Sequence, residues 1–400
     1  MTSAAAPLPL PRPEVPLWLP ALFIVCSTLA MHVFVPALPL AAADLGASPH
    51  ALQLSISLYI AGLAAGQLVY GPLADRYGRR PVLLAGLGLY TLAGLAASLA
   101  PTAGMLIAAR LLQALGGCSG MVLARAIVRD TSTTADAASR MASVNLIVTI
   151  APGIAPIIGA AMAPTLGWRS ILIALTVLGV AAMLVAWRQL PETGRHAQAQ
   201  DLRSLARAYA GLLRSPAFLG YSVGGGCATT AMYAFIAAAP FIFVDRLHRP
   251  AHEVGWCLAM LVSGIWLGSM LATRLLRRFP LRPLLIGANA VSVAAALGLL
   301  ALVLLDRLTV AGTVGTMFLF TLGAGLSSPA ALTQAISVDP TVTGSASGLY
   351  GCMQMAVGAV CSSLVGLGGD PALAAALTLS GAGLVGQFGF WIAGRDRSRS

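Results

Sequence analysis

Lysine is absent from this chain of 400 residues, so all 24 strongly basic side chains are arginines, and only 13 residues are acidic. Charged residues make up 9% of the sequence, against about a quarter in soluble domains, whereas 58% is hydrophobic. The mean hydropathy of +0.85 agrees with this imbalance. So few charges exclude a large soluble domain. We therefore predict a membrane protein, whose length leaves room for many helices of about 20 apolar residues.

Side-chain sets that carry enzyme chemistry are also missing at membrane depth. The six cysteines lie within or at the edges of apolar runs without CxxC spacing, which indicates small apolar packing residues. We find no paired carboxylates, metal-ligand cluster or serine and histidine set there, and predict no catalytic residue, no metal and no cofactor. No basic cluster with interleaved aromatic residues suggests nucleic acid as a partner. A receptor is disfavoured because no soluble sensing domain is present.

The apolar runs predict an all-α polytopic membrane protein with twelve transmembrane helices. The runs are continuous and about twenty residues long, whereas barrel strands alternate over about ten residues. The helices are expected near residues 17–40, 51–73, 82–100, 104–124, 142–163, 170–190, 217–244, 254–273, 283–304, 308–331, 345–367 and 371–394. They form a first six-helix bundle at 17–190 and a second at 217–394, with tails at 1–16 and 395–400. A basic, partly amphipathic linker at 191–216 is expected to lie along the membrane surface.

The distribution of arginines predicts the orientation in the membrane. Most arginines, including those of the linker and both tails, are expected on one side. On the other side we expect only Arg169, Arg246, Arg249 and Arg307. By the positive-inside rule the arginine-rich side is cytoplasmic, which places both termini inside a bacterial-type inner (plasma) membrane. The net charge of +11 then reflects topology.

The two predicted bundles resemble each other in sequence. At an offset of 201 residues, from His32 to Tyr233, "HVFVPALPLAAADLGASP" aligns with "YAFIAAAPFIFVDRLHRP". The other aligned pairs are Phe34 and Phe235, Pro39 and Pro240, Asp44 and Asp245, Pro49 and Pro250, and, with one further residue of offset, Arg80 and Pro81 with Arg282 and Pro283. A nearly constant offset at matching topological positions predicts parallel repeats about an axis normal to the membrane.

The loop between the second and third helices, "GPLADRYGRRP", resembles the corresponding loop of the major facilitator superfamily of secondary transporters. The matching positions are Gly71, Asp75, Arg76, Gly78, Arg79 and Arg80. The resemblance implies a latch that clamps the two bundles together and stabilises the outward-open state. The second repeat, "GSMLATRLLRRFPLRP", keeps its arginines but lacks the acid, so we expect a one-sided latch. The alternative is a loop whose charges only fix the topology.

Helices 4 and 5 carry further similarity. "ARLLQALGGCSGMVLARAIVRD" resembles the proton-linked exporters of the superfamily, with Arg110, Gln113 and Gly116 on motif positions. "APGIAPIIGAAMAP" is similar to the glycine and proline motif of antiporters, although Ala155 and Ala160 stand where glycine is usual. This second similarity implies a hinge formed by Pro152, Gly153, Pro156 and Gly159. With "VPALPLAAADLG" in helix 1, the chain resembles the Bcr/CflA group of drug-resistance efflux transporters from about residue 20 to 390.

This resemblance implies proton-coupled efflux of drugs or drug-like molecules by alternating access, without an enzymatic step. Few polar groups, numerous methionines and some aromatic residues favour an apolar or amphipathic substrate over a sugar. Polarity and depth select as cavity residues Tyr233, Asn145, Gln113, Tyr350 and Gln354. Transport of a specific small metabolite, such as an amino acid derivative, in either direction stays open. We expect a monomer whose partners are the substrate, protons and the lipid membrane.

Proton coupling needs a group that changes charge inside the cavity, and all 13 acids lie at helix ends, in loops or in tails. The exporters that this chain resembles commonly carry an acid in helix 1, four residues before a proline. Here that position is His32, ahead of Pro36, and no other histidine lies at membrane depth. Since the unperturbed pKa of histidine is about 6.5, we predict that His32, with Arg110 nearby, couples transport to protons. The alternatives are a His32 that only bonds a neighbouring helix, or a facilitator without coupling.

Overall fold

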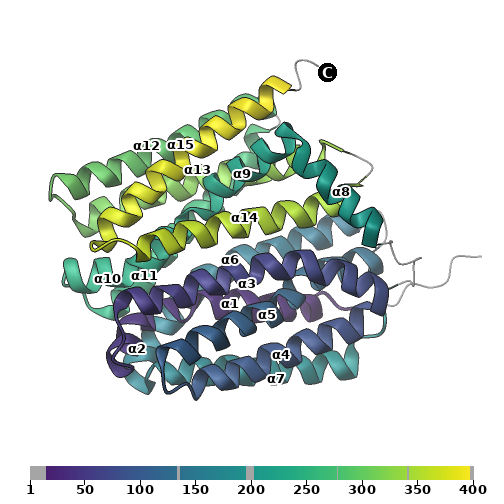
Figure 1. The fold of residues 1–400 in the computed structure, drawn as a ribbon, viewed down its shortest axis with the longest axis horizontal. Coiled ribbons are helices and arrows are strands. Elements are labelled where there is room, and N and C mark those ends of the chain that lie inside the picture. Colours follow the sequence, from purple (N-terminus) through teal and green to yellow (C-terminus); the bar gives the residue numbers. More distant parts are fainter. Residues whose placement is uncertain (1–14, 133–135, 195–201, 277, 340–341, 397–400) are drawn as a thin grey trace, which may run out of the picture.

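The computed structural model describes residues 15–132, 136–194, 202–276, 278–339 and 342–396, which are almost entirely helical and form two bundles (Figure 1). The first bundle contains α1 (Trp18–His32), η1 (Val35–Ala37), α2 (Leu38–Asp44), α3 (Pro49–Tyr77), α4 (Arg79–Ser98), α5 (Ala103–Thr131), α6 (Ala137–Leu166) and α7 (Trp168–Gln189). The linker helix is α8 (Leu202–Arg214). The second bundle contains α9 (Pro216–Thr230), α10 (Met232–Phe241), η2 (Ile242–Arg246), α11 (Ala251–Leu275), α12 (Leu281–Leu304), α13 (Val310–Ile336), α14 (Thr343–Gly366) and α15 (Pro371–Asp396).

The predicted twelve-span organisation is confirmed, with helices that extend beyond the apolar runs. Among the described residues, 11 helices or helix groups are long and apolar enough to cross a membrane, and α6 adds the apolar segment Ile150–Leu166. Helix α5 continues to Thr131 although its predicted span ends at 124, because polar residues prolong a helix once it leaves the hydrocarbon. Four helices begin after a serine or threonine whose hydroxyl accepts a backbone N–H: Ser48, Thr102, Ser215 and Thr309.

The first span of each bundle is interrupted, which the continuous apolar runs do not reveal. Helix α1 ends at His32, and the chain passes through η1 before α2 begins. Pro36 lies four residues after His32 and has no N–H, so the helical hydrogen bond to the carbonyl of His32 is missing. The seventh span breaks at Ala231 between α9 and α10 and ends in the π-helical turn η2. Both bundles therefore place irregular backbone within their first span, although the break at Ala231 aligns with Ala30, a few residues before the break that follows His32.

One end of the molecule carries the linker helix, and the opposite end carries an ion pair in each bundle. We call the face with α8 and the ends of α3 and α15 the linker face, and the opposite face, with the α2–α3 and α14–α15 loops, the far face (right and left in Figure 1). On the far face an ion pair ties the first span of each bundle to its last span. Arg169 binds Asp44 in the first bundle, and Arg246 binds Asp370 at 2.8 Å in the second. Both bundles therefore have this ion pair, but with the charges exchanged. The acid belongs to the first span in the first bundle and precedes the last span in the second bundle.

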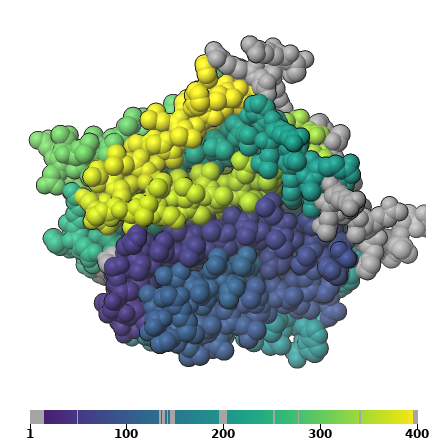
Figure 2. Space-filling view, in the orientation of Figure 1, coloured from purple at the N-terminus to yellow at the C-terminus, as the bar shows by residue number. Residues whose placement is uncertain are grey.

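The bundles meet along two helix pairs, α3 with α14 and α6 with α11. The boundary between α3 (purple) and α14 (yellow-green) crosses the face shown in Figure 2. Toward the far face the buried hydroxyl of Ser57 donates to that of Ser362 at 2.9 Å, and the amide of Gln53 donates to the carbonyl of Ala237 at 3.5 Å. These hydrogen bonds close the far-face half of the interface between the bundles.

Helix α8 lies at the linker face and packs on the second bundle. Leu212 is buried in a cluster with Phe218 of α9 and Leu349 of α14. Tyr209 and Leu68 of α3 pack against the same cluster. The predicted linker at 191–216 therefore contains a helix that packs on α9 and α14 of the second bundle, in a cluster that Leu68 of α3 also contacts.

Candidate functional site

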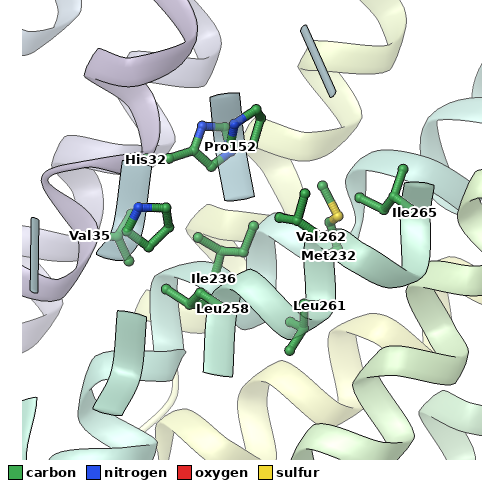
Figure 3. Close-up of a pocket in the computed structure, with 10 residues that line it drawn as sticks. His32, Val35, Pro152, Met232, Ile236, Leu258, Leu261, Val262 and Ile265 are labelled. Carbon is green, nitrogen blue, oxygen red and sulfur yellow. The ribbon is translucent and has the colours of Figure 1, made fainter. Parts of the chain in front are cut away.

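His32 lies at the end of α1, where the first bundle faces the second. The residue is 4% exposed, and its ring centroid lies 6.1 Å from that of Tyr233 on α10. The two residues that the internal repeat aligns are thus neighbours across the interface between the bundles. His32 also lines a small cavity whose other walls come from η1, α6, α10 and α11 (Figure 3), among them Val35, Pro152, Pro156, Met232, Leu258 and Val262.

The hydrogen bonding of His32 indicates which ring nitrogen is free. Nδ1 lies 2.9 Å from the carbonyl oxygen of Thr28. A carbonyl oxygen can only accept, so we assign the ring hydrogen to Nδ1, which leaves a lone pair on Nε2 of the neutral ring. Nε2 is buried and has no hydrogen-bond partner among the described residues. Nε2 is therefore the ring nitrogen that is available to accept a proton.

The cavity beside His32 is much smaller than a substrate site. Its volume is about 10 Å³, close to the least that holds one water molecule. Pockets for drug-sized ligands measure about 300–1,000 Å³. The described conformation therefore closes the interface around His32 and leaves no room for a ligand in this cavity.

The other predicted cavity residues occupy different places. Gln354 of α14 points toward α9, where its amide donates to the hydroxyl of Thr229 at 2.7 Å. Tyr350 also faces α9, and its hydroxyl is buried without a hydrogen-bond partner in the described parts of the chain. The side chain of Asn145 lies outside the described residues. Of the predicted cavity residues, the structure places Tyr233 beside the His32 ring but not among the residues that line this cavity, while the two on α14 pack inside the second bundle.

Arg110 is 1% exposed and is held inside the first bundle. Its guanidinium donates to the carbonyl of Ala30 and to the side-chain oxygen of Gln113, both at 2.7 Å, and lies 4.3 Å from the ring centroid of Tyr59. Ala30 and His32 are two residues apart, so they face nearly opposite sides of α1. The two predicted coupling residues therefore approach different sides of this helix. Gln113, fully buried as the partner of Arg110, is directed into the first bundle.

The glycine and proline segment of α6 forms the contact with α1 and α11. Helix α6 carries three internal prolines, two of which line the His32 cavity. A Cβ atom on Gly159 would overlap the carbonyl oxygen of Val33, so α6 and the chain after α1 touch backbone to backbone. On Gly153, a Cβ would lie 3.3 Å from Val262 of α11. This segment thus sits where both bundles converge on His32.

The charges of the α3–α4 loop hold the first bundle together. Arg79 pairs with Asp75 at 2.6 Å and with Asp130 of α5 at 3.0 Å. Glu192, after α7, accepts the backbone N–H groups of Arg79 at 2.8 Å and Arg80 at 3.2 Å, at the start of α4. Each of these contacts joins parts of one bundle. In this conformation the predicted latch residues are thus engaged within the first bundle.

Two glycines of the loop differ in what their positions require. Gly78 makes the turn between α3 and α4 with a φ of +94°, and a Cβ there would lie 2.5 Å from the carboxylate of Glu192. Only glycine satisfies both conditions. Gly71 has open space around it, and Arg76 stacks on the ring of Tyr77 at 5.3 Å. The spacing of the motif therefore reflects a turn at Gly78 more directly than a close helix approach at Gly71.

Several contributors to the site are hard to find from the sequence. Leu258 and Val262 of α11 line the cavity, but they are ordinary residues of an apolar span. Ser57 and Ser362 are single hydroxyls in long spans, which is a weak signal. Glu192 offers a clearer one, because it is the acid that directly follows the sixth span on the same face as the arginine-rich loop.

Known proteins are similar to this chain in sequence and in fold. Residues 21–363 match the Major Facilitator Superfamily. The chain is 27% identical over 337 residues to a bicyclomycin resistance protein homolog of Haemophilus influenzae, with 84% of each chain covered. It is 37% identical over 179 residues to the multidrug resistance protein MdtL of Escherichia coli O81, with 43% of this chain and 46% of that protein covered. A solved D-xylose-proton symporter has the same fold, with a TM-score of 0.76 at 12% identity and 94% and 96% of the two chains covered. Because the family match spans most of its length, this chain belongs to the major facilitator superfamily of transporters.

Proposed function

We propose that this chain exports drugs or drug-like small molecules in exchange for protons, by alternating access, and is not an enzyme. The relatives named for bicyclomycin and multidrug resistance support a drug as the exported molecule. Spans rich in apolar side chains support an apolar or amphipathic substrate. The observation that carries the coupling is the buried Nε2 of His32 at the interface between the bundles, which finds no partner in the described parts of the chain.

His32 can couple proton uptake to movement because its surroundings change when the bundles separate. In the closed arrangement the cavity beside the ring is lined by apolar side chains of α6, α10 and α11, and the phenol of Tyr233 is the titratable group that faces the ring. An imidazolium in these surroundings would have no counter-charge, which is costly. Two states can be shifted only by an interaction that differs between them. A proton on His32 therefore favours separation of the bundles toward the far face.

Substrate accumulation in inverted membrane vesicles tests this function. Export from the cell becomes uptake into such vesicles, so a panel of amphipathic drugs is assayed with and without an acidic vesicle interior. We expect at least one drug to accumulate, and only with the pH gradient. Drug uptake that does not depend on the pH gradient would indicate a facilitator. Uptake of a metabolite such as an amino acid derivative, with no drug transported, would indicate the alternative substrate class.

We further propose that the linker face is cytoplasmic, as the arginine distribution supports. In a cysteine-free variant, Arg203→Cys on α8 should resist a membrane-impermeant thiol reagent applied to intact cells. His248→Cys, at an exposed far-face position, should react. Permeabilised cells provide the control, because both cysteines should then be labelled. Labelling of residue 203 in intact cells would reverse the orientation.

We propose that the α3–α4 loop acts as a latch in the opposite conformation, which is closed at the linker face. Asp75→Asn should slow transport about two- to fivefold, as expected for an exposed ion pair worth up to about 1 kcal/mol. The fold should persist because Arg79 keeps its bond to Asp130, and because Glu192 still accepts the backbone N–H groups at the start of α4. Initial uptake rates and melting temperatures measure both effects.

The matched control for Asp75→Asn is Glu253→Gln, which breaks a comparable i,i+4 pair with Arg249 on the far face. This control should transport at the parental rate. Arg79→Ala should be impaired at least as strongly as Asp75→Asn. If both Asp75→Asn and Arg79→Ala transport at the parental rate, the charges of the loop only fix the topology and the loop is not a latch.

A further inference from the structure

The second bundle carries a large apolar groove on its outer surface, apart from the interface between the bundles. Its volume is about 880 Å³, and it lies between α14 and α15 with Cys227 of α9 at its floor. Both helices lie on the face shown in Figures 1 and 2, where they meet at the far-face loop and diverge toward the linker face. The walls include Ala356, Val360 and Leu364 of α14 and Leu377, Gly381 and Val385 of α15.

The dimensions and exposure of the groove fit a hydrocarbon chain of the membrane. Val360 and Leu377 on its two walls are 59% and 52% exposed, and exposed apolar side chains at this depth lie against lipid. From Pro371 to Val385 helix α15 rises by about 21 Å. One leaflet contributes about 15 Å of hydrocarbon, so the groove extends over its full depth. Small residues such as Gly381 leave room for a chain to sink between the helices instead of lying across them.

Asp370 at the far-face end of the groove connects it to a chain of ion pairs with Arg246 and Asp306. Asp370, which lines the groove, binds Arg246 through one oxygen at 2.8 Å, and its other oxygen accepts N–H groups at the start of α15. Arg246 also binds Asp306 at 3.2 Å. The Asp306 side chain is 92% exposed, so its carboxylate keeps room for a second partner, and the Arg246 side chain is 30% exposed. A guanidinium suits a phosphate, and an exposed carboxylate with one oxygen still available suits an ammonium group.

We propose that this groove binds a phospholipid of the far-face leaflet, with an acyl chain along α15 and a phosphoethanolamine headgroup at Arg246 and Asp306. The ligand class is a zwitterionic phospholipid with a primary ammonium group. Phosphatidylglycerol offers no cation to Asp306, and the quaternary ammonium of phosphatidylcholine has no N–H to donate. Every residue that lines the groove belongs to the second bundle, so the site is independent of the proposed substrate path.

Native mass spectrometry of the full chain in mild detergent tests the site. Palmitoyl-oleoyl phosphatidylethanolamine, phosphatidylglycerol and phosphatidylcholine are added separately, and the lipid retained per chain is counted. The ethanolamine lipid should be retained about threefold more than the other two, the size expected for one exposed ionic contact. Ala356→Trp fills the groove and should lose the retained lipid. Ala181→Trp, at an exposed position of α7, is the matched control and should retain it.

A second variant tests recognition of the lipid headgroup separately from binding of the acyl chain, and it should not destabilise the fold. Asp306→Asn lies on an exposed side chain and should abolish the headgroup preference while the lipid is still bound. Equal retention in the parent and Ala356→Trp, or equal loss in Ala181→Trp, would overturn the groove as a site. Equal retention of the three lipids by the parent would overturn the headgroup assignment. A dimer that Ala356→Trp dissociates would assign the groove to a second copy of the chain.

Discussion

Replacing His32 with glutamine should lower pH-gradient-driven drug accumulation in inverted vesicles by at least about tenfold, equivalent to about 1.4 kcal/mol of lost driving force. Glutamine can still donate to the carbonyl of Thr28, but it cannot take up a proton. The bundles of the variant should therefore still close around this position. Transport down a drug gradient, measured without a pH gradient, should continue because that direction needs no proton.

Tyr233→Phe is the matched control for His32→Gln. It keeps the aromatic ring that packs against His32 and removes only the hydroxyl. Gradient-driven accumulation in this variant should stay within about twofold of the parent, since a change of that size is below 0.5 kcal/mol. Unchanged gradient-driven uptake in His32→Gln would mean that the proton travels by another route.

Joining the bundles covalently on the far face should abolish transport. Ser57 and Ser362 hydrogen bond across the interface at 2.9 Å, so cysteines at both positions lie within reach of a disulfide. In a cysteine-free background the oxidised double variant, Ser57→Cys with Ser362→Cys, should transport at less than about a tenth of the reduced rate. Alternating access requires this contact to open, and a covalent bond holds it closed. Drug uptake before and after oxidation measures the effect.

The single variants Ser57→Cys and Ser362→Cys control for oxidation of isolated thiols and should transport at equal rates under both conditions. Reduction of the double variant should restore its activity. Mass spectrometry confirms that the disulfide has formed. Full transport by a fully oxidised double variant would show that the far-face interface stays closed during the transport cycle, which contradicts alternating access at this contact.

The sequence predicts the spans well because the physical signal is strong and local. Each span is a long apolar run, and the helix is the simplest structure that satisfies its backbone within lipid. The breaks after His32 and at Ala231 are less visible, since the residues around them are as apolar as the rest of the span. Pro36 marks the first break, but whether a proline kinks, ends or merely bends a helix depends on the neighbouring helices.

The candidate site is predictable only in part, because it depends on which helix faces meet. The repeat aligns His32 with Tyr233, and the structure places these two rings together across the interface. Arg110 is a buried cation in the sequence prediction and in the structure, yet it approaches α1 from a different side. Polarity and depth also select Gln354, but its amide donates a hydrogen bond to Thr229 within the second bundle. Depth along a helix can be read from sequence, whereas rotation about its axis is set by packing.

Substrate-induced proton release from the purified chain in weakly buffered detergent tests proton exchange at His32 most directly. A drug that accumulates in the vesicle assay is added to the parent and to His32→Gln, and a pH indicator reports released protons while a separate binding measurement confirms that both proteins bind the drug. The parent should release protons in proportion to the drug bound, and His32→Gln should bind the drug with no release. Equal proton release by the two proteins would contradict the account.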